Sequence, residues 1–195
     1  MPTTANIAKI NGIVFSGAAA ASDAHTLIAT QTASGSATLS FTLGLDSLFD
    51  AYEFRCMSMH PATNAAKFSF QVNAAGQTGF NETMTTTTFM AYHGEDSYGA
   101  RAYSTGDDQA QGTAYQTICP TTSDASDAAM SGVLTLYAPS STTYVKQFTV
   151  RTSVPASNGL MYDFYTAGYI NVTAAIDEIS FKFHTGNIDA GVIKM

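Results

Sequence analysis

Charged side chains are scarce in this sequence. Of its 195 residues only 12% are Asp, Glu, Lys or Arg, with eight Lys or Arg against fifteen Asp or Glu. The formal charge of -7 therefore reflects a shortage of cations, and no basic run is present that could follow a phosphate backbone. We expect no nucleic-acid partner.

Long apolar runs, tryptophan and paired cysteines are lacking as well. No stretch approaches the roughly 20 apolar residues that a membrane-spanning helix needs, so no membrane association is expected. The two cysteines, Cys56 and Cys119, lie singly in apolar runs and not in the paired spacing of zinc or redox sites. This placement favours buried free thiols, with a disulfide between them as the alternative.

Short apolar and aromatic runs separated by turn residues fill most of the chain. Segments 37–43, 67–72 and 179–183 alternate apolar and polar residues with the period of two that half-buried strands have. Further strands are expected at 51–59, 85–92, 113–118, 132–137, 144–152, 161–165, 168–172 and 191–194. A short helix at 46–52 and a helical turn at 172–176 are the two helical segments that the pattern favours.

Many strands without intervening helices predict an all-β fold, an antiparallel β-sandwich of a jelly-roll-like kind. Residues 24–195 form this domain. Residues 1–23 are rich in Ala, Gly, Ser and Thr and show neither strand alternation nor a helical stripe, which predicts an extended N-terminal arm. The alternation assigns one core to Leu39, Phe41, Phe68, Phe70, Phe148, Ile179, Phe181 and Phe183.

Motifs for catalysis or metal binding are not evident. The four histidines are dispersed, none with a second His or Cys at metal-ligand spacing, and no nucleophile motif lies at a strand-to-helix turn. We expect no catalytic residue, no metal and no cofactor. Acids gather in two long loops, where calcium binding or a glycan-cleaving carboxylate pair are the alternatives: Glu95, Asp96, Asp107, Asp108, Asp124 and Asp127.

Three tyrosines lie in or beside these acidic loops, namely Tyr98, Tyr103 and Tyr115. A tyrosine combines a large apolar ring with a polar hydroxyl, which suits it to protein interfaces and to stacking on sugars. These three residues are the predicted contacts for a protein partner or a glycan.

Four blocks of the sequence are distinctive. The most specific is C-terminal, Ala167–Ile179 followed by Phe181–Phe183 and Gly186–Met195, and the others are Met59–Asn64, Thr86–His93 and Leu136–Lys146. These blocks resemble a family of small virion proteins of tailed bacteriophages, especially marine ones. The resemblance implies a β-rich component of the phage particle, made in the host bacterial cytoplasm, with no catalytic residues to carry over.

The expected function is that of a structural virion component, most simply a capsid decoration or cement protein that acts through subunit contacts. Its expected partners are further copies of itself, as a homotrimer, and other virion proteins such as the major capsid protein. A closed oligomer would cover the sheet edges of such a low-charge body. The alternative is a receptor- or glycan-binding knob of a head or tail fibre, in which loops 94–106 and 121–132 contact the host.

Overall fold

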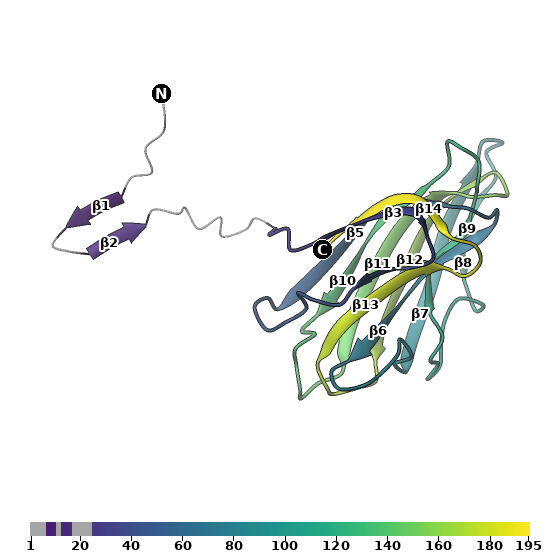
Figure 1. The fold of residues 1–195 in the computed structure, drawn as a ribbon. Helices are drawn as coiled ribbons and strands as arrows, with labels where there is room; N and C mark the ends of the chain where they lie inside the picture. The colour runs from purple at the N-terminus through teal and green to yellow at the C-terminus, as the bar shows by residue number, and fades with distance from the viewer. Residues whose placement is uncertain (1–6, 11–12, 17–24) are drawn as a thin grey trace, which may run out of the picture.

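The computed structural model describes residues 7–10, 13–16 and 25–195. From residue 25 onward the chain folds into two antiparallel sheets that pack on each other (Figure 1). The expected all-β antiparallel sandwich is confirmed. The described residues contain no helix, and so none that is long and apolar enough to cross a membrane.

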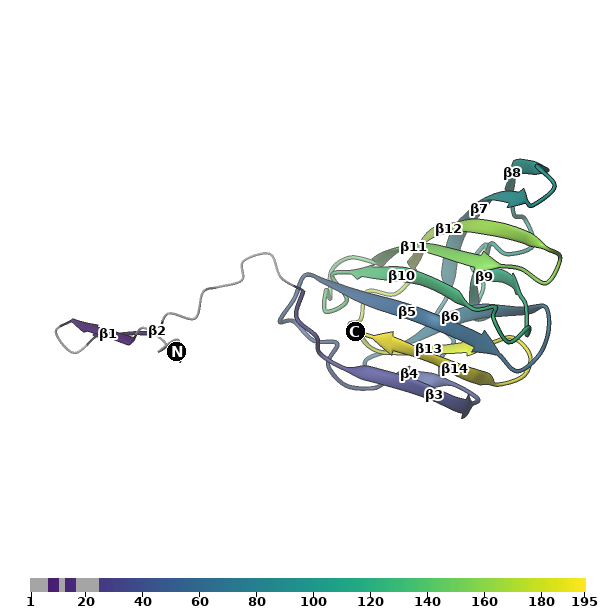
Figure 2. The same ribbon diagram turned by 90° about the horizontal axis from the view of Figure 1, so that it is seen from above.

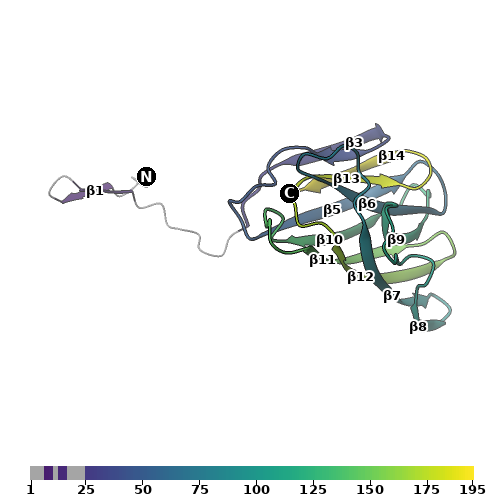
Figure 3. The same ribbon diagram turned by 90° about the horizontal axis from the view of Figure 1, so that it is seen from below.

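The two sheets differ in size. The larger sheet has the order β3-β14-β5-β10-β11-β12-β7-β8, and the smaller one β4-β13-β6-β9. Figure 2 shows the strands of the larger sheet in this order, and Figure 3 shows β6, β9 and β13 lying over them. The larger sheet comprises β3 (Thr30–Ser36), β14 (Ile188–Lys194), β5 (Ala51–Pro61), β10 (Met130–Tyr137), β11 (Lys146–Pro155), β12 (Leu160–Ile170), β7 (Met84–Gly94) and β8 (Gly99–Tyr103). The smaller sheet comprises β4 (Leu39–Phe41), β13 (Ile176–Phe183), β6 (Ala66–Ala74) and β9 (Gln116–Thr122).

Two further strands lie in the N-terminal region. Strands β1 (Ile7–Ile10) and β2 (Ile13–Ser16) pair antiparallel, which corrects the expectation that residues 1–23 contain no strand. Alternation is hard to see in strands of four residues, because so short a segment spans only two periods. The predicted arm otherwise falls on residues outside the described ranges.

The core is built from the inward side chains of both sheets. All eight residues assigned to it from the alternation are buried, so this prediction is confirmed. Phe181 of β13 lies at its centre, with its ring near those of Phe54 from β5 and Phe68 and Phe70 from β6. Because these rings come from both layers, they hold the two sheets together.

Both cysteines face this core. Cys56 lies on β5 and Cys119 on β9, and the expectation of buried free thiols is confirmed. Burial in an apolar environment disfavours the thiolate and raises the pKa of each thiol to about 12.

Polar side chains replace apolar ones beneath β7 and β12. Segment 104–112 follows β8 and runs along the edge of β7 that β8 leaves unpaired. There the Ser104 amide donates to the Thr88 carbonyl, and the Thr86 amide donates to the Gln109 carbonyl. Thr86 donates to Gln116 Oε1 (2.8 Å), and Gln116 Nε2 donates to the Asp107 carbonyl (2.7 Å). We call this the inner polar network. It satisfies the side chains of Thr86 and Gln116, which would be costly to bury alone.

The two predicted helical segments are wrong. In the first, Leu48 is exposed whereas Tyr52 is a buried residue of β5, so the two do not share a helical face. The Asp46 carboxylate instead accepts bonds from the Leu48 amide (2.8 Å) and the Tyr52 hydroxyl (2.7 Å). This local side-chain bonding competes with a helix.

The second segment lies beside a buried lysine. Lys146 Nζ donates to the carbonyls of Val172, Thr173 and Ala174. These carbonyls point at one ammonium group, and an extended loop rather than a helical turn presents them.

The strand predictions are mostly confirmed, with three differences. Residues 161–165 and 168–172, expected as two strands, belong to the single strand β12, which ends at Ile170. Strand β3 was not predicted, and β8 lies within a segment that was expected to be a loop. Both are edge strands, and their exposed, polar or glycine-containing sequences lack a buried apolar face.

Strands β12 and β7 approach each other closely at Gly168. A Cβ atom there would lie 2.5 Å from the Thr85 carbonyl oxygen and 3.0 Å from the Thr86 Cα. Backbone atoms cannot avoid the added methyl group by changing rotamer. We therefore expect Gly168→Ala to lower the free energy of unfolding by about 1–3 kcal/mol in denaturant titrations.

Gly106→Ala is the matched control, since nothing lies within 4 Å of its added Cβ. It should lower the free energy of unfolding by less than about 0.5 kcal/mol. Equal losses in the two variants would contradict the close approach at Gly168.

Candidate binding surface

The outer face of the large sheet carries one row of side chains across six strands. The register pairs Arg55 with Val133, Val133 with Arg151, and Arg151 with Tyr165. It continues from Tyr165 to Phe89 and from Phe89 to Tyr103. Directly paired residues have neighbouring Cβ atoms on the same face of the sheet. The row thus ends in three adjacent aromatic side chains, Tyr165, Phe89 and Tyr103, which we call the aromatic row.

The aromatic row is partly open to solvent. The rings of Phe89 and Tyr165 stack with centroids 4.8 Å apart and an interplanar angle of 6°. Phe89 nevertheless remains 50% exposed and Tyr103 54% exposed. One face of Phe89 lies against Tyr165, so its exposed area belongs to its rim and to the face on the side of β8.

A fork of hydrogen bonds fixes one end of the row. Arg151 Nε and Nη2 donate to the two carboxylate oxygens of Asp163 at 2.9 and 2.8 Å. The Tyr165 hydroxyl donates to Asp163 Oδ2 at 2.8 Å, and the Arg151 guanidinium lies 5.1 Å from the Tyr165 ring centroid. Arg151 holds the pKa of Asp163 below its usual value, and the bond to Asp163 raises the pKa of Tyr165. Asp163 therefore stays ionised at neutral pH.

The three predicted tyrosines do not come together. Tyr103 is the third member of the aromatic row, and its hydroxyl donates to Asp108 at 2.6 Å. The Tyr98 ring lies beside Tyr92, with centroids 5.8 Å apart. Tyr115 lies on the other layer of the sandwich, where Lys182 Nζ of β13 is 4.1 Å from its ring centroid.

The acidic loops do not form a compact cluster. Asp107 pairs with Lys67, with Nζ 2.6 Å from Oδ1, and Asp108 bonds Tyr103. Within residues 25–195, no group of three His, Cys, Asp or Glu side chains has the arrangement of a metal site.

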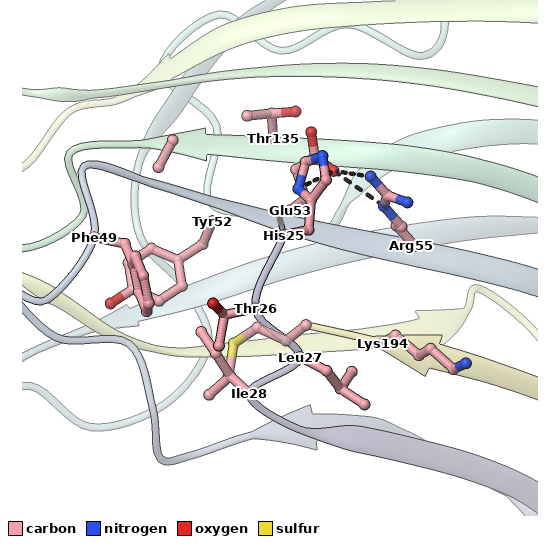
Figure 4. Close-up of a pocket in the computed structure, with 12 residues that line it drawn as sticks. His25, Thr26, Leu27, Ile28, Phe49, Tyr52, Glu53, Arg55, Thr135 and Lys194 are labelled. Carbon is pink, nitrogen blue, oxygen red and sulfur yellow. Dashed lines mark hydrogen bonds and ion pairs between the residues drawn. The ribbon is translucent and has the colours of Figure 1, made fainter. Parts of the chain in front are cut away.

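A hollow lies at the end of the sandwich where residues 25–28 lead into β3. Its volume is about 450 Å³, and it lies over β5, β10 and β14 (Figure 4). Glu53 accepts hydrogen bonds from Arg55 Nε (3.0 Å) and Nη2 (2.9 Å) at its rim, and His25 Nδ1 lies 3.6 Å from Glu53 Oε2. The remaining lining is mainly apolar, including Ile28, Phe49, Tyr52 and Met195.

One exposed leucine, Leu27, lines this hollow, and two more belong to segments that reach it. Leu27, Leu43 and Leu48 are 61%, 83% and 73% exposed. Leu43 precedes Gly44, where an added Cβ would lie 2.9 Å from both Ile28 and Met195, and Leu48 precedes Phe49 in the lining. We call Leu27, Leu43, Leu48 and the hollow the apolar end.

Sequence reasoning missed Phe89, Arg151, Asp163 and the apolar end. Alternation in β7 and β12 could have placed Phe89 and Tyr165 on outward faces, but only the register shows that they are neighbours. Comparison with known proteins adds no relative, since the chain matches no family model, no curated protein and no solved structure.

Proposed function

We propose that this protein is a non-enzymatic structural component of a tailed-phage virion, a decoration or cement subunit on the capsid that acts through contacts with other subunits. The apolar end is the observation that supports the proposal best. Leu43 and Leu48 each leave more than two thirds of their surface in water, although the chain has few charges to keep it soluble.

Clustered exposed apolar side chains indicate a surface that another protein covers. Single exposed leucines are ordinary on any protein, but here Leu27 lines a hollow with a mainly apolar lining, and Leu43 and Leu48 are next in sequence to residues at that hollow. Covering this end would remove apolar area from water, and each leucine fully buried would contribute about 1.5–3 kcal/mol. The partners that we propose are further copies of the chain, arranged as a trimer, and the major capsid protein.

The N-terminal segment joins the folded domain at this same end, since residue 25 lines the hollow. We propose that residues 1–23 anchor the domain to a neighbouring subunit or to the shell. Among the described residues, strands β1 and β2 of this segment pair only with each other, and an isolated two-stranded hairpin is marginally stable in water. Contacts made elsewhere would offset the conformational freedom that the segment loses.

The test uses particles of the phage that encodes this chain, produced from a mutant in which its gene is deleted. Purified protein is added, and the amount that sediments with the particles is measured. We expect saturable binding by the full chain, at least tenfold weaker binding by Leu43→Ser/Leu48→Ser, and loss of binding on deletion of residues 1–23.

Met57→Ser/Met161→Ser is the matched control, because both methionines are exposed and neither lines the hollow. It should bind as the full chain does. If mass spectrometry finds no copy of this chain in wild-type particles and the purified protein does not bind them, the virion proposal is wrong.

A further inference from the structure

The aromatic row has an unpaired cation beside it. Arg101 lies on β8 two residues before Tyr103, and it pairs with Ala91 in the sheet just as Tyr103 pairs with Phe89. Side chains two residues apart on a strand point to the same face, with Cα atoms about 7 Å apart. Arg101 is exposed, and no ion pair is formed by it among the described residues.

We propose that the aromatic row and Arg101 form a binding site for an acidic oligosaccharide. A sugar ring lies on the exposed rings of Phe89 and Tyr103, and its carboxylate pairs with the Arg101 guanidinium. The site is distinct from the apolar end and does not depend on the virion assignment.

The rings suit a sugar because of their charge distribution and their exposure. An aromatic face is electron-rich, and it attracts the weakly positive C–H groups that cover one side of a pyranose ring. Phe89 has no polar atom, and half of its surface stays in water because nothing else in residues 25–195 covers it. A ligand with a flat apolar face would remove this exposed area from water.

The surroundings suit the hydroxyl groups of a sugar. Arg151 has five N–H donors, of which Asp163 takes two, and its side chain is 67% exposed. The exposed threonines Thr87 and Thr149 belong to the neighbouring row of the same face. Donors and acceptors therefore lie beside the rings, and the Asp163 fork fixes the nearest of them in place.

The unpaired Arg101 favours a ligand with negative charge. The other two arginines on this face are neutralised, Arg55 by Glu53 and Arg151 by Asp163. A planar guanidinium binds a carboxylate or a sulfate through two parallel hydrogen bonds. Arg101, which has no ion pair among the described residues and lies next to exposed aromatic rings, complements one anionic group on a ligand.

A single cation favours an acidic sugar over a nucleic acid. Strands of nucleic acid require several cations that follow the phosphate backbone as well as stacking rings. An acidic oligosaccharide needs one cation for each contacted carboxylate. The neutral hydroxyl side chains around Phe89 fit the hydroxyl groups of a sugar better than they fit the apolar centre of a protein interface.

The experiment compares two hexasaccharides of one linkage by isothermal titration calorimetry. β-1,4-Linked mannuronate hexamer carries a carboxylate on every ring, and β-1,4-linked mannohexaose carries none. We expect the mannuronate hexamer to bind at least tenfold more tightly than mannohexaose at low salt, with the difference shrinking as salt rises.

Three variants separate the two parts of the site. Phe89→Ala should weaken binding of the mannuronate hexamer at least tenfold, and Tyr103→Thr should weaken it in the same direction. Arg101→Gln should remove the preference for the acidic hexamer. Lys194→Gln makes the same charge change on the same face near the hollow, and it should leave binding unchanged.

Both aromatic changes are at half-exposed positions, and circular dichroism of each variant confirms folding before titration. The proposal is overturned if neither hexasaccharide binds at millimolar concentration, or if binding survives Phe89→Ala and Tyr103→Thr. Equal binding of the two hexasaccharides overturns the acidic assignment. If no sugar binds but Phe89→Ala abolishes sedimentation with particles, the surface is a protein interface and the proposal is wrong.

Discussion

Phe181→Ala is expected to lower the free energy of unfolding by about 3–5 kcal/mol. Phe181 is fully buried, and four other rings surround it, from both sheets of the sandwich. Ring centroids lie 6.5 Å away for Phe41, 5.6 Å for Phe54, 6.0 Å for Phe68 and 6.3 Å for Phe70. Removing the ring leaves a cavity that these neighbours cannot fill without leaving their own packed positions. Denaturant unfolding followed by far-UV circular dichroism measures the loss, because the chain has no tryptophan.

Phe89→Ala is the control for this change, since it removes the same atoms from a half-exposed position. It should cost less than about half as much, because no closed cavity forms and only one stacked ring loses its partner. A loss below about 1 kcal/mol for Phe181→Ala would contradict a central role for this ring.

Alkaline conditions should destabilise the protein through its two thiols. The folded state raises the pKa of Cys56 and Cys119 from 9.0 to about 12, mainly because both are buried. Above pH 9 the unfolded chain loses these protons while the folded chain keeps them, so stability falls as pH rises from about 9 towards 12. At pH 10.5 each thiol should contribute a loss of about 2 kcal/mol, about 4 kcal/mol together.

The comparison is between the wild type and Cys56→Ala/Cys119→Ala, with unfolding measured from pH 7.5 to 10.5. The variant carries a loss that does not depend on pH, because small cavities remain, and lacks the alkaline loss of the thiols. Burial also lowers the pKa of Lys146, whose effect has the opposite sign: stability rises with pH as the unfolded chain holds its proton longer. Lys146 is present in both proteins, so its effect cancels. Parallel pH curves would refute the buried thiols.

The alternation of apolar residues predicted the fold class and the core well. In β13 each of Ile179, Phe181 and Phe183 is buried, as their spacing of two indicates. The other face of β13 carries polar residues such as Ser180 and Lys182, so the alternation records which face enters the apolar core. The strand that sequence reasoning split, β12, contains Gly168, and a glycine within a strand reads as a break when its neighbours in space are unknown.

Helix prediction failed where tertiary bonds outweighed local spacing. Leu48 and Tyr52 have helical spacing, yet Tyr52 belongs to the buried face of β5. The loop at 172–174 is shaped by Lys146, which is 26 or more residues away along the chain. Neither influence can be read from a window of neighbouring residues.

The candidate sites were harder to predict than the fold. Tyr103 was identified from its place beside an acidic loop, whereas its partners Phe89 and Tyr165 are distant in sequence and meet only because β12 pairs with β7 and β7 with β8. Strand order is not encoded in periodicity. The apolar end was missed because single leucines in loops look ordinary until the structure brings their segments together at one hollow.

The inner polar network has a consequence for how the sequence can vary. An apolar core accepts exchanges among side chains of similar volume, whereas a buried network loses a bonded partner with almost every substitution. Thr86 and Gln116 are therefore the positions under β7 where natural variation should be most restricted. The outward side chains of the same strands carry no such restraint, so the ligand preference of the aromatic row can diverge between related chains while the scaffold beneath it stays the same.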